Sequence, residues 1–205
     1  MDKNRRFNGR DKRILTQAIE ELHINNRDFR RAANFDFIAY VLMLILITLA
    51  FRTFLFQPVW VDGESMQLTL LDGELIIVDK TRYMYTLPAR GDIVICYYPD
   101  EPQSRVKRVV ALAGDTVEIR DGKVYLNGSP LNEGDYWSGT IERDMPIQQV
   151  AYGHVFVIGD NRNNSSDSRS PDVGAIPLGK ISGRANFVFF PFRNMRSIFS
   201  NNFYV

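Results

Sequence analysis

The chain of 205 residues has few of the side chains that most often build metal and redox sites. It contains one cysteine, Cys96, and two histidines, His23 and His154. A single cysteine excludes a disulfide framework within the chain and any zinc site made of several thiolates. Two histidines are too few for a histidine-rich metal site. We therefore expect no metal centre and no bound cofactor.

Neither sign of charge dominates the sequence. Its 25 lysines and arginines nearly balance 24 aspartates and glutamates, which gives a net charge of +1. Proteins that bind nucleic acid usually carry a strong positive field, so we expect no nucleic-acid partner. Hydrophobic residues at 45% and charged residues at 24% are typical of globular proteins and exclude a disordered or fibrous chain.

The apolar residues are concentrated in one uncharged run, 37–51 (FIAYVLMLILITLAF), which resumes after Arg52 and ends at Phe56. A bilayer core needs about 20 residues of helix, and an arginine near the end can extend its charge to the interface. A buried core helix is the weaker alternative because the run has no polar face. A removable secretory signal would begin earlier and carry a small-x-small cleavage site. We predict a permanent transmembrane helix at 37–56.

The charges that flank this run predict its orientation. Residues 1–36 contain nine lysines and arginines, whereas residues 58–78 contain four acidic residues and no basic one. The positive-inside rule places the basic flank in the cytoplasm. We therefore expect a single-pass protein of the cell membrane, with a cytoplasmic segment at 1–36 and an extracytoplasmic domain at 57–205.

Beyond the predicted anchor, short β-branched and aromatic runs replace the long apolar run. They lie at residues 75–78, 93–98, 117–120, 123–126, 155–158 and 186–190. The pair Asp121-Gly122 between two of them is a strong hairpin signal, and no long helical period follows residue 60. We predict a mainly β domain, either a partly open barrel or antiparallel sheets folded on one another.

The usual catalytic bases and thiols are poorly placed for chemistry in this domain. His23 lies in the predicted cytoplasmic segment, and His154 immediately precedes a predicted strand. Cys96 lies within the apolar run IVICYY and reads as an inert core thiol. A hydrolase built from this composition therefore needs a nucleophile and a base of other kinds.

Ser65 and Lys107 supply such a pair. Ser65 follows Gly63 in the turn-prone segment VDGESM, although a serine in such a loop is most often a turn residue. Lys107 and Arg108 begin an apolar strand and must face opposite sides of it; an ordinary solvated basic pair is the alternative. Desolvation lowers the pKa of a buried lysine, and a neutral amine is a competent base for a serine hydroxyl. A Ser–Lys dyad is thus the nucleophilic scheme that this composition permits without histidine.

A third polar segment, 159–169 (GDNRNNSSDSR), directly follows a predicted strand. Its residue types are typical of a solvated loop. They also suit a hydrogen-bonded scaffold that holds a base in place, because two acidic residues and two arginines alternate with small hydroxyls.

Taken in order, four segments resemble motifs of the bacterial type I signal peptidases, which are membrane-anchored Ser–Lys proteases. They are FLFQPVWVDGESMQLTL, RVKRVVALAGD, GDNRNNSSDSR and GRANFVFFPF. The family's third motif, G-D-N-R-x-x-S-x-D-S-R, is matched at every specified position. The resemblance spans residues 54–192 and so covers most of the predicted extracytoplasmic domain.

The resemblance implies a role for each matched residue. Ser65 is the expected nucleophile and Lys107 its general base, with Ser165 hydrogen-bonding to the lysine amine to orient it. The other expected contributors are an ion pair of Asp167 with Arg169, Asp160 in the same network, and Met66 and Gly63 beside the substrate cleft and the oxyanion hole. The backbone N–H of Ser65 is the expected oxyanion donor.

The chain departs from the family pattern at a few positions. Leu68 stands where the family usually has proline, and Arg105 stands where many members have tyrosine. Ala111 and Ala113 replace a glycine and a proline of the second motif. Gly63 precedes the nucleophile where some members carry a serine, which leaves oxyanion stabilisation more dependent on the backbone. None of these departures removes a catalytic group.

The function that the resemblance implies is removal of N-terminal signal peptides from secreted preproteins by a membrane-bound serine endopeptidase. Its partners would be preproteins with small residues at the first and third positions before the cut, and the lipid bilayer; we expect a monomer. Within the family, a dedicated pilin-type peptidase is the alternative. Outside it stand a non-catalytic β module on an anchor and a self-cleaving Ser–Lys repressor, whose soluble DNA-binding domain has no counterpart in residues 1–36.

Overall fold

The structure is a computed structural model that describes residues 9–99, 101–134, 136–137 and 139–198, apart from the side chains at 9, 11, 22–33 and 51–54. The chain divides into two compact units, Met1–Ala50 and Phe51–Val205. Each unit is considered by itself.

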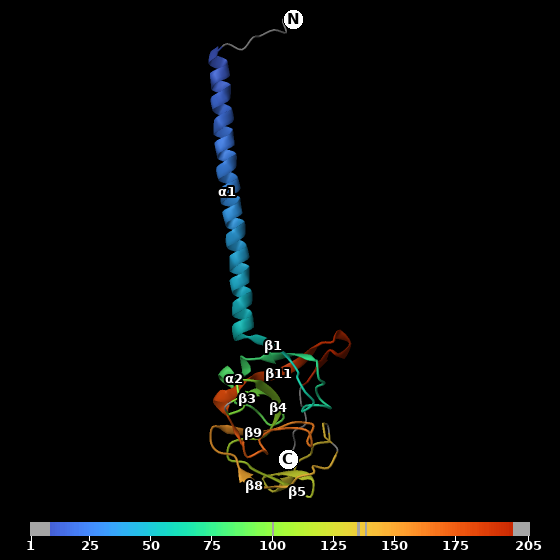
Figure 1. The fold of residues 1–205 in the computed structure, drawn as a ribbon. Helices are drawn as coiled ribbons and strands as arrows, with labels where there is room; N and C mark the ends of the chain where they lie inside the picture. The colour runs from blue at the N-terminus through green and yellow to red at the C-terminus, as the bar shows by residue number, and fades with distance from the viewer. Residues whose placement is uncertain (1–8, 100, 135, 138, 199–205) are drawn as a thin grey trace. The chain divides into compact units, whose positions relative to one another are not determined.

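A single helix, α1 (Gly9–Phe54), contains the long apolar run (Figure 1). From residue 34 to residue 50 its side chains are exposed except for the half-buried Val41, with Tyr40 at 62% and Leu46 at 66%. Among the helical residues described, no stretch is both long enough and apolar enough to cross a bilayer. Side chains 51–54 of the predicted span lie outside the described set, as do residues 1–8 of the predicted cytoplasmic segment. Phe56, the last residue of the predicted span, belongs to a strand.

The second unit is built from two sheets whose pairings are all antiparallel. In spatial order the larger sheet comprises β1 (Phe56–Trp60), β2 (Leu75–Asp79), β11 (Ile181–Phe190), β3 (Ile93–Tyr97), β4 (Ser104–Ala111), β9 (His154–Ile158) and β10 (Ile176–Pro177), with β12 (Arg196–Ser197) on β11. The smaller sheet comprises β7 (Ser129–Pro130), β6 (Lys123–Leu126), β5 (Thr116–Arg120) and β8 (Met145–Gln149). Only short helices interrupt them among the described residues: α2 (Arg82–Tyr85), η1 (Leu178–Lys180) and η2 (Phe192–Asn194).

These sheets confirm the mainly β prediction, and each predicted strand is present. The alternation in the sequence becomes alternation in burial; β2, for example, buries Ile76 and Val78 and leaves its other residues half-buried. The predicted hairpin joins β5 to β6 at Asp121 and Gly122, whose φ values are +50° and +72°. Two successive positive φ values are what a two-residue hairpin loop of right-handed twist requires.

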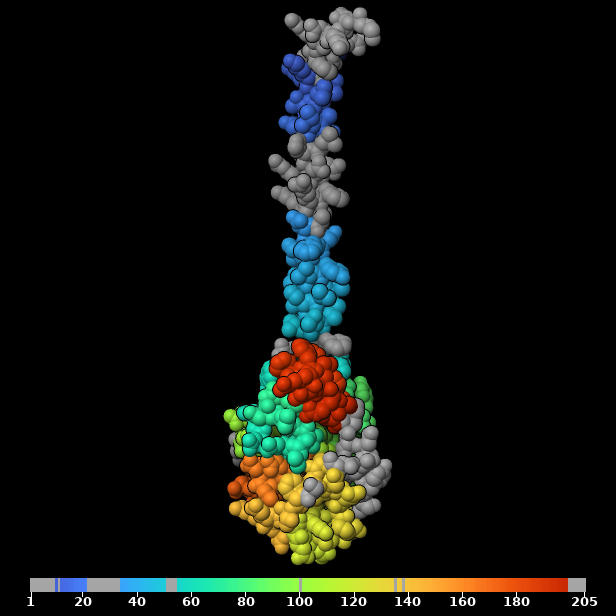
Figure 2. Space-filling view, turned by 90° about the vertical axis from the view of Figure 1, so that its right-hand side faces the viewer, coloured from blue at the N-terminus to red at the C-terminus, as the bar shows by residue number. Residues whose placement is uncertain are grey.

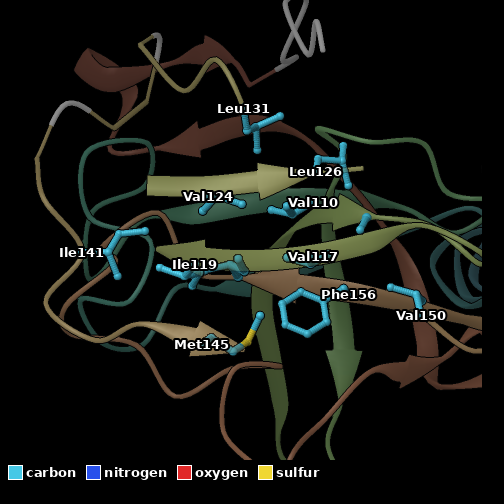
Figure 3. Packing of buried hydrophobic residues seen from close by; sticks show 12 residues of the cluster. Val110, Val117, Ile119, Val124, Leu126, Leu131, Ile141, Met145, Val150 and Phe156 are labelled. Carbon is cyan, nitrogen blue, oxygen red and sulfur yellow. The ribbon is translucent and has the colours of Figure 1, made fainter. Parts of the chain in front are cut away.

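The hydrophobic core has three clusters. The largest lies between the sheets, where Val110 and Phe156 of the larger sheet meet Val117, Ile119 and other residues of the smaller one (Figure 3). Burying one such side chain contributes about 1.5–3 kcal/mol, so this cluster holds the sheets together. A second cluster packs Met66 and other apolar residues of the segment after β1 against β2 and β11.

A strand from the C-terminal part of the chain completes the centre of the larger sheet. Strand β11 lies between β2 and β3, with Val188 opposite Ile76 and Arg184 opposite Val94. In Figure 2 the C-terminal residues, drawn in red, accordingly lie against the teal residues of the segment that includes β2. Strand β2, near the start of the unit, and strand β11, near its end, therefore stabilise each other.

Candidate active site

The segment that carries Ser65 is a tight loop fixed from both sides. Its backbone bends at Gly63, where φ is +90° and the N–H donates to Asp72 Oδ1 at 2.8 Å. Met66 and Leu70 insert into the core below, and Met66 O accepts hydrogen bonds from the N–H groups of Thr69 and Leu70. Because the flanking apolar side chains are buried, the half-buried Ser65 is held at a fixed place on the surface.

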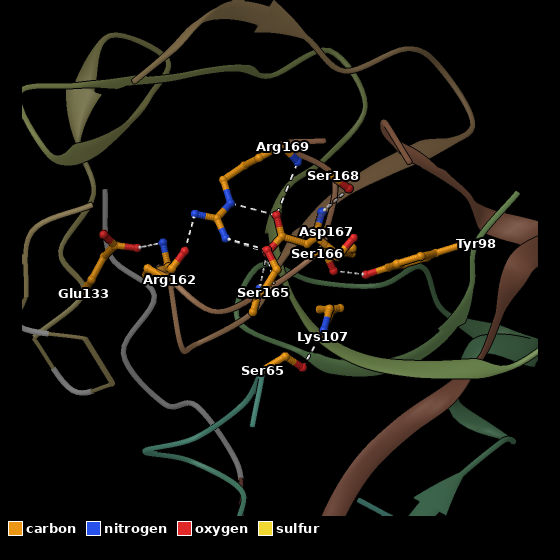
Figure 4. A network of polar contacts seen from close by, with 12 residues as sticks. Ser65, Tyr98, Lys107, Glu133, Arg162, Ser165, Ser166, Asp167, Ser168 and Arg169 are labelled. Carbon is orange, nitrogen blue, oxygen red and sulfur yellow. Dashed lines mark hydrogen bonds and ion pairs between the residues drawn. The ribbon is translucent and has the colours of Figure 1, made fainter. Parts of the chain in front are cut away.

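Lys107 reaches this serine from the middle of β4. Its Nζ lies 2.6 Å from Ser65 Oγ, within hydrogen-bond distance (Figure 4). The side chain is almost fully buried, with 3% of the residue exposed. Lys107 and its neighbour Arg108 contact different groups, Ser65 and Asp160, as the alternation of a strand requires.

Burial lowers the pKa of Lys107 below its ordinary value of 10.5, because a charged amine loses its hydration in this site. The carboxylate of Asp167 acts in the opposite direction, and the nearby Arg105 and Arg169 lower the pKa further. The net effect is a lowered pKa, which favours the neutral amine. The neutral amine is the form that accepts a proton from a hydroxyl.

The segment 159–169 forms a compact network behind this pair (Figure 4). Asp167, 1% exposed, accepts hydrogen bonds from the N–H of Gly159 at 2.9 Å and from both Nε and Nη2 of Arg169 at 2.7 Å. Burial raises the pKa of Asp167, but these hydrogen bonds and the Arg169 charge outweigh it and hold the pKa below the ordinary value of 3.8. Asp167 is therefore a carboxylate at neutral pH, and the predicted ion pair with Arg169 is present.

Ser165 lies where the sequence predicts, but its hydroxyl has a different partner. Its Oγ donates to Asp167 Oδ2 at 2.6 Å, whereas the hydrogen bond of Lys107 is with Ser65. The hydroxyl thus donates to the stronger acceptor, the carboxylate. In this geometry Ser165 connects Asp167 to the site, and its predicted contact with the amine stays a prediction.

Asp160 belongs to a second network beside the first. Its two carboxylate oxygens accept from Nε and Nη2 of Arg108 at 2.8 and 2.6 Å. Thr69 Oγ1 donates to the same carboxylate at 2.5 Å. The pair is fully buried, so breaking it by removing one partner would leave an uncompensated charge. Asp160 therefore joins β4, the strand of Lys107, to the segment that follows Ser65.

Two residues that the sequence did not single out position the nucleophile directly. The N–H of Asn161 donates to Ser65 O at 3.0 Å, and its side-chain amide donates to Glu64 O at 3.1 Å. At Gly159 a Cβ would come within 2.5 Å of Ser65 O and would also collide with the Ser165 hydroxyl. Both residues belong to the GDNR motif, which was the one sign in the sequence that they matter for the site. The motif does not show that they contact a segment about 90 positions away.

Ser65 and Lys107 line a groove with a volume of about 620 Å³. One wall is formed by residues 59–66, including Gly63 and Met66, and the other by residues 103–107, with Tyr98, Glu101, Asn164 and Ser166 completing it. The N–H of Ser65 makes no hydrogen bond within the described part of the chain, so it is available to an oxyanion. Gly63 lies in the wall, but its N–H is already engaged by Asp72.

Cys96 and His154 do not line the groove, and the side chain of His23 lies outside the described set. Cys96 is fully buried in β3, where burial raises its pKa to about 12, which is consistent with an inert thiol. His154 begins β9, and its Nδ1 lies 2.9 Å from Tyr152 O. Within the described residues, no group of three or more histidine, cysteine, aspartate or glutamate side chains has metal-binding geometry.

Comparison with known proteins gives consistent matches. Residues 34–190 match the family described as signal peptidase, peptidase S26. The chain is 38% identical over 173 residues to a signal peptidase I of Bacillus licheniformis, covering 79% of this chain and 91% of that protein. It is also 38% identical to a probable signal peptidase I-1 of Synechocystis, covering 75% and 81% of the two chains. The signal peptidase I T of Bacillus subtilis is similar at 38% identity, with 76% and 85% covered.

Proposed function

Since the chain belongs to the signal peptidase family of the S26 peptidases, we propose that it removes N-terminal signal peptides from secreted preproteins, with Ser65 as nucleophile and Lys107 as general base. The observation that carries this assignment is the 2.6 Å contact between Lys107 Nζ and Ser65 Oγ in a buried site. No histidine is needed, because a desolvated amine performs the same proton transfer.

The reaction follows from this geometry. Neutral Lys107 takes the proton of the Ser65 hydroxyl while Oγ attacks the scissile carbonyl, and the N–H of Ser65 stabilises the oxyanion. The resulting ammonium donates its proton to the leaving amine, so that an acyl-enzyme remains. Lys107 then deprotonates a water molecule, which attacks the ester; the ammonium returns this proton to Ser65 Oγ as the ester bond breaks, and the signal peptide is released with its new carboxylate. Asp167, Arg169 and Ser165 hold the surrounding loop in place throughout.

Ser65→Ala and Lys107→Ala test this assignment. Each variant should lose preprotein cleavage by at least about 10³-fold, because nucleophile and base act as one unit. New N-termini identified by mass spectrometry measure the cleavage, and circular dichroism confirms the fold. Lys180→Ala is the matched control, since Lys180 is an exposed lysine elsewhere in the domain. Cleavage retained by Lys107→Ala would reject the dyad.

The pH dependence provides a second test. Only the neutral amine acts as base, so kcat/KM should rise with pH through the lowered pKa of Lys107. A profile that stays flat from pH 6 to 10 contradicts a buried lysine base. An acylating probe directed at Ser–Lys sites should label Ser65, which a non-catalytic β module would not allow.

We also propose that the protein is anchored in the cell membrane by the predicted span 37–56, of which α1 forms the part up to Phe54, with residues 57–205 outside the cytoplasm. Support comes from the uncharged run, the basic flank and the exposure of its apolar side chains. Confinement to the membrane would raise the effective concentration of preproteins whose apolar segment lies there. Cysteines introduced at residues 12 and 152 test the orientation: an impermeant reagent on intact cells should label only the second.

A cluster of exposed aromatic side chains supports the proposal that the domain acts at a lipid surface. Trp60 of β1 and Phe190 of β11 stack edge to face at 6.0 Å, and Phe192 contacts Phe190 at 5.6 Å. These three residues are 41–65% exposed, and a cluster of exposed aromatic residues is unusual on a surface that faces only water. Aromatic side chains are typical of the membrane–water interface.

A further inference from the structure

The groove contains an ion pair that the proposed reaction does not use. Arg105 of β4 donates from Nη2 and Nε to Glu101 Oε2 at 2.9 and 3.3 Å. Both residues line the groove that Ser65 and Lys107 open into. Each side chain is 43% exposed, so the pair lies at the solvent boundary rather than in the core.

The strand places this pair close to the base. Arg105 precedes Lys107 by two residues, so both side chains leave the same face of β4. Their partners in β3 are Cys96 and Val94, which confirms the register. Two residues of a strand span about 7 Å, a distance at which a partly exposed charge still acts on a buried amine.

We propose that Arg105 is a positioning residue that acts on the reaction through Lys107. Its charge disfavours the ammonium form of the base, and Glu101 determines how much of that charge the base experiences. The inference rests on the proposed function, because it takes Lys107 as the base. Beyond that function, the Glu101–Arg105 pair would set the pH range in which Lys107 is neutral and the enzyme is active.

The other groups around the amine define the background against which this pair acts. Burial lowers the pKa of Lys107 most, Asp167 raises it, and Arg169 lowers it together with Arg105. Cys96 is a neutral thiol at physiological pH, because burial raises its pKa to about 12. Across the groove, the acidic residues on the opposite wall are Asp62 and Glu64. The Glu101–Arg105 pair can be altered at the surface without disturbing a buried partner.

Neutralising the two residues separately tests the proposal. In the full chain, in detergent, Arg105→Gln should move the midpoint of the kcat/KM profile to higher pH by about 0.3–0.7 unit, because a positive charge has been removed. Glu101→Gln should move the midpoint to lower pH, because Arg105 is no longer compensated. The double variant should return close to the original midpoint, and raised salt should shrink both single shifts.

The control is Arg120→Gln in β5, which removes the arginine of another exposed pair, with Glu118 at 3.4 Å. It should leave the midpoint in place. Shifts of the two single variants in the same direction, or of neither, overturn the inference, because a purely structural role does not produce opposite signs. If Lys107→Ala still cleaves, the proposed function itself fails; if that variant is inactive while the midpoints do not move, only this inference fails.

Discussion

Lys107 is held in an environment that opposes its charge, and this has a cost in stability. A buried amine that is protonated lowers the free energy of unfolding, because the unfolded chain hydrates it fully. The pKa of Lys107 is lowered from 10.5 by burial. Between the folded value and 10.5 the unfolded chain binds more protons, so stability rises with pH there; below the folded value the full cost is present.

Lys107→Met should therefore abolish cleavage and raise the free energy of unfolding by about 1 kcal/mol, since active-site residues are often kept at the expense of stability. The gain should be largest at low pH and should shrink toward pH 10.5. Urea unfolding of both proteins at several pH values measures it, with Lys180→Met as the exposed control. A loss of stability at every pH would contradict the argument.

Gly159 is a second residue whose substitution we expect to disturb the site. Gly159→Ala would place a methyl group 2.5 Å from Ser65 O, so either the serine loop or the following segment must move. We expect a loss of about 1–3 kcal/mol and a fall in kcat larger than the change in KM, measured by peptide cleavage and thermal unfolding. Gly179→Ala is the control, because a Cβ there meets nothing within 4 Å; an unchanged Gly159→Ala enzyme would disprove the steric role.

Residue chemistry alone left Ser65 as a turn residue and Lys107 as a solvated base open as alternatives. The resemblance to the family motifs singled out the two residues, and the structure places Lys107 Nζ 2.6 Å from Ser65 Oγ. The side-chain contacts were less accessible. Ser165 donates to Asp167 rather than to the amine, and Asn161 binds the carbonyl of Ser65. Such contacts depend on angles and distances between segments that a linear motif does not contain.

At the scale of elements, the turn after the nucleophile contains strained backbone. Leu68 has a φ of +98°, a region that favours glycine, and its side chain is 67% exposed. The leucine therefore gains little from burial while it bears a backbone cost of about 1–3 kcal/mol. Proline, which the resembling motif usually has here, fixes φ near −65° and does not fit this turn.

Leu68→Gly should raise the free energy of unfolding by about 0.5–1 kcal/mol, which is the relief of strain less the extra entropy of glycine in the unfolded chain. Leu68→Pro should destabilise the domain and reduce cleavage, because the turn must refold. Thermal unfolding of the two variants beside the parent measures this. Stabilisation by proline would show that the turn has another conformation in solution.

Strand prediction succeeded where alternation was clear and failed where it was not. β1 was partly assigned to the anchor because its sequence FQPVW continues the apolar run. Pro58 also argues against a central strand, yet β1 lies at the edge of the sheet, where proline is tolerated. The two-residue strands β7, β10 and β12 are too short to have a period.

At the scale of the whole molecule, four buried or half-buried carboxylates with lowered pKa values make folding sensitive to acid. Burial raises the pKa of Glu74, Asp79, Asp115 and Asp167, but hydrogen bonds and arginine charges outweigh it and leave each below its ordinary value of 3.8 or 4.5. Their contribution to stability is complete above those ordinary values and is lost as pH falls through the folded ones.

The free energy of unfolding should thus fall by about 2–5 kcal/mol between pH 5 and pH 2, measured by urea unfolding in detergent. Arg196→Gln removes the partner of Glu74 and should make this fall smaller while lowering stability at pH 7. A free energy that does not change from pH 5 to pH 2 would contradict the shifts.

The overall class of the fold was predictable from short β-branched runs, whereas the strand order was not. β11 pairs with β2 and β3 although about 100 residues separate them in the chain. Local patterns determine which residues form strands, but partners at this separation are determined by how the three core clusters pack together. The sequence motifs therefore indicated which residues come together in the candidate site, whereas the order of the strands was not predictable from them.

The burial of Cys96 has a practical consequence for experiments. Thiol reagents such as maleimides require an accessible thiolate, and this sulfur is both inaccessible and protonated at neutral pH. Cysteines introduced on the surface can therefore receive fluorophores or spin labels while the native residue remains in place. Distances between such probes on the two walls of the groove would measure any change in its width when a preprotein is added.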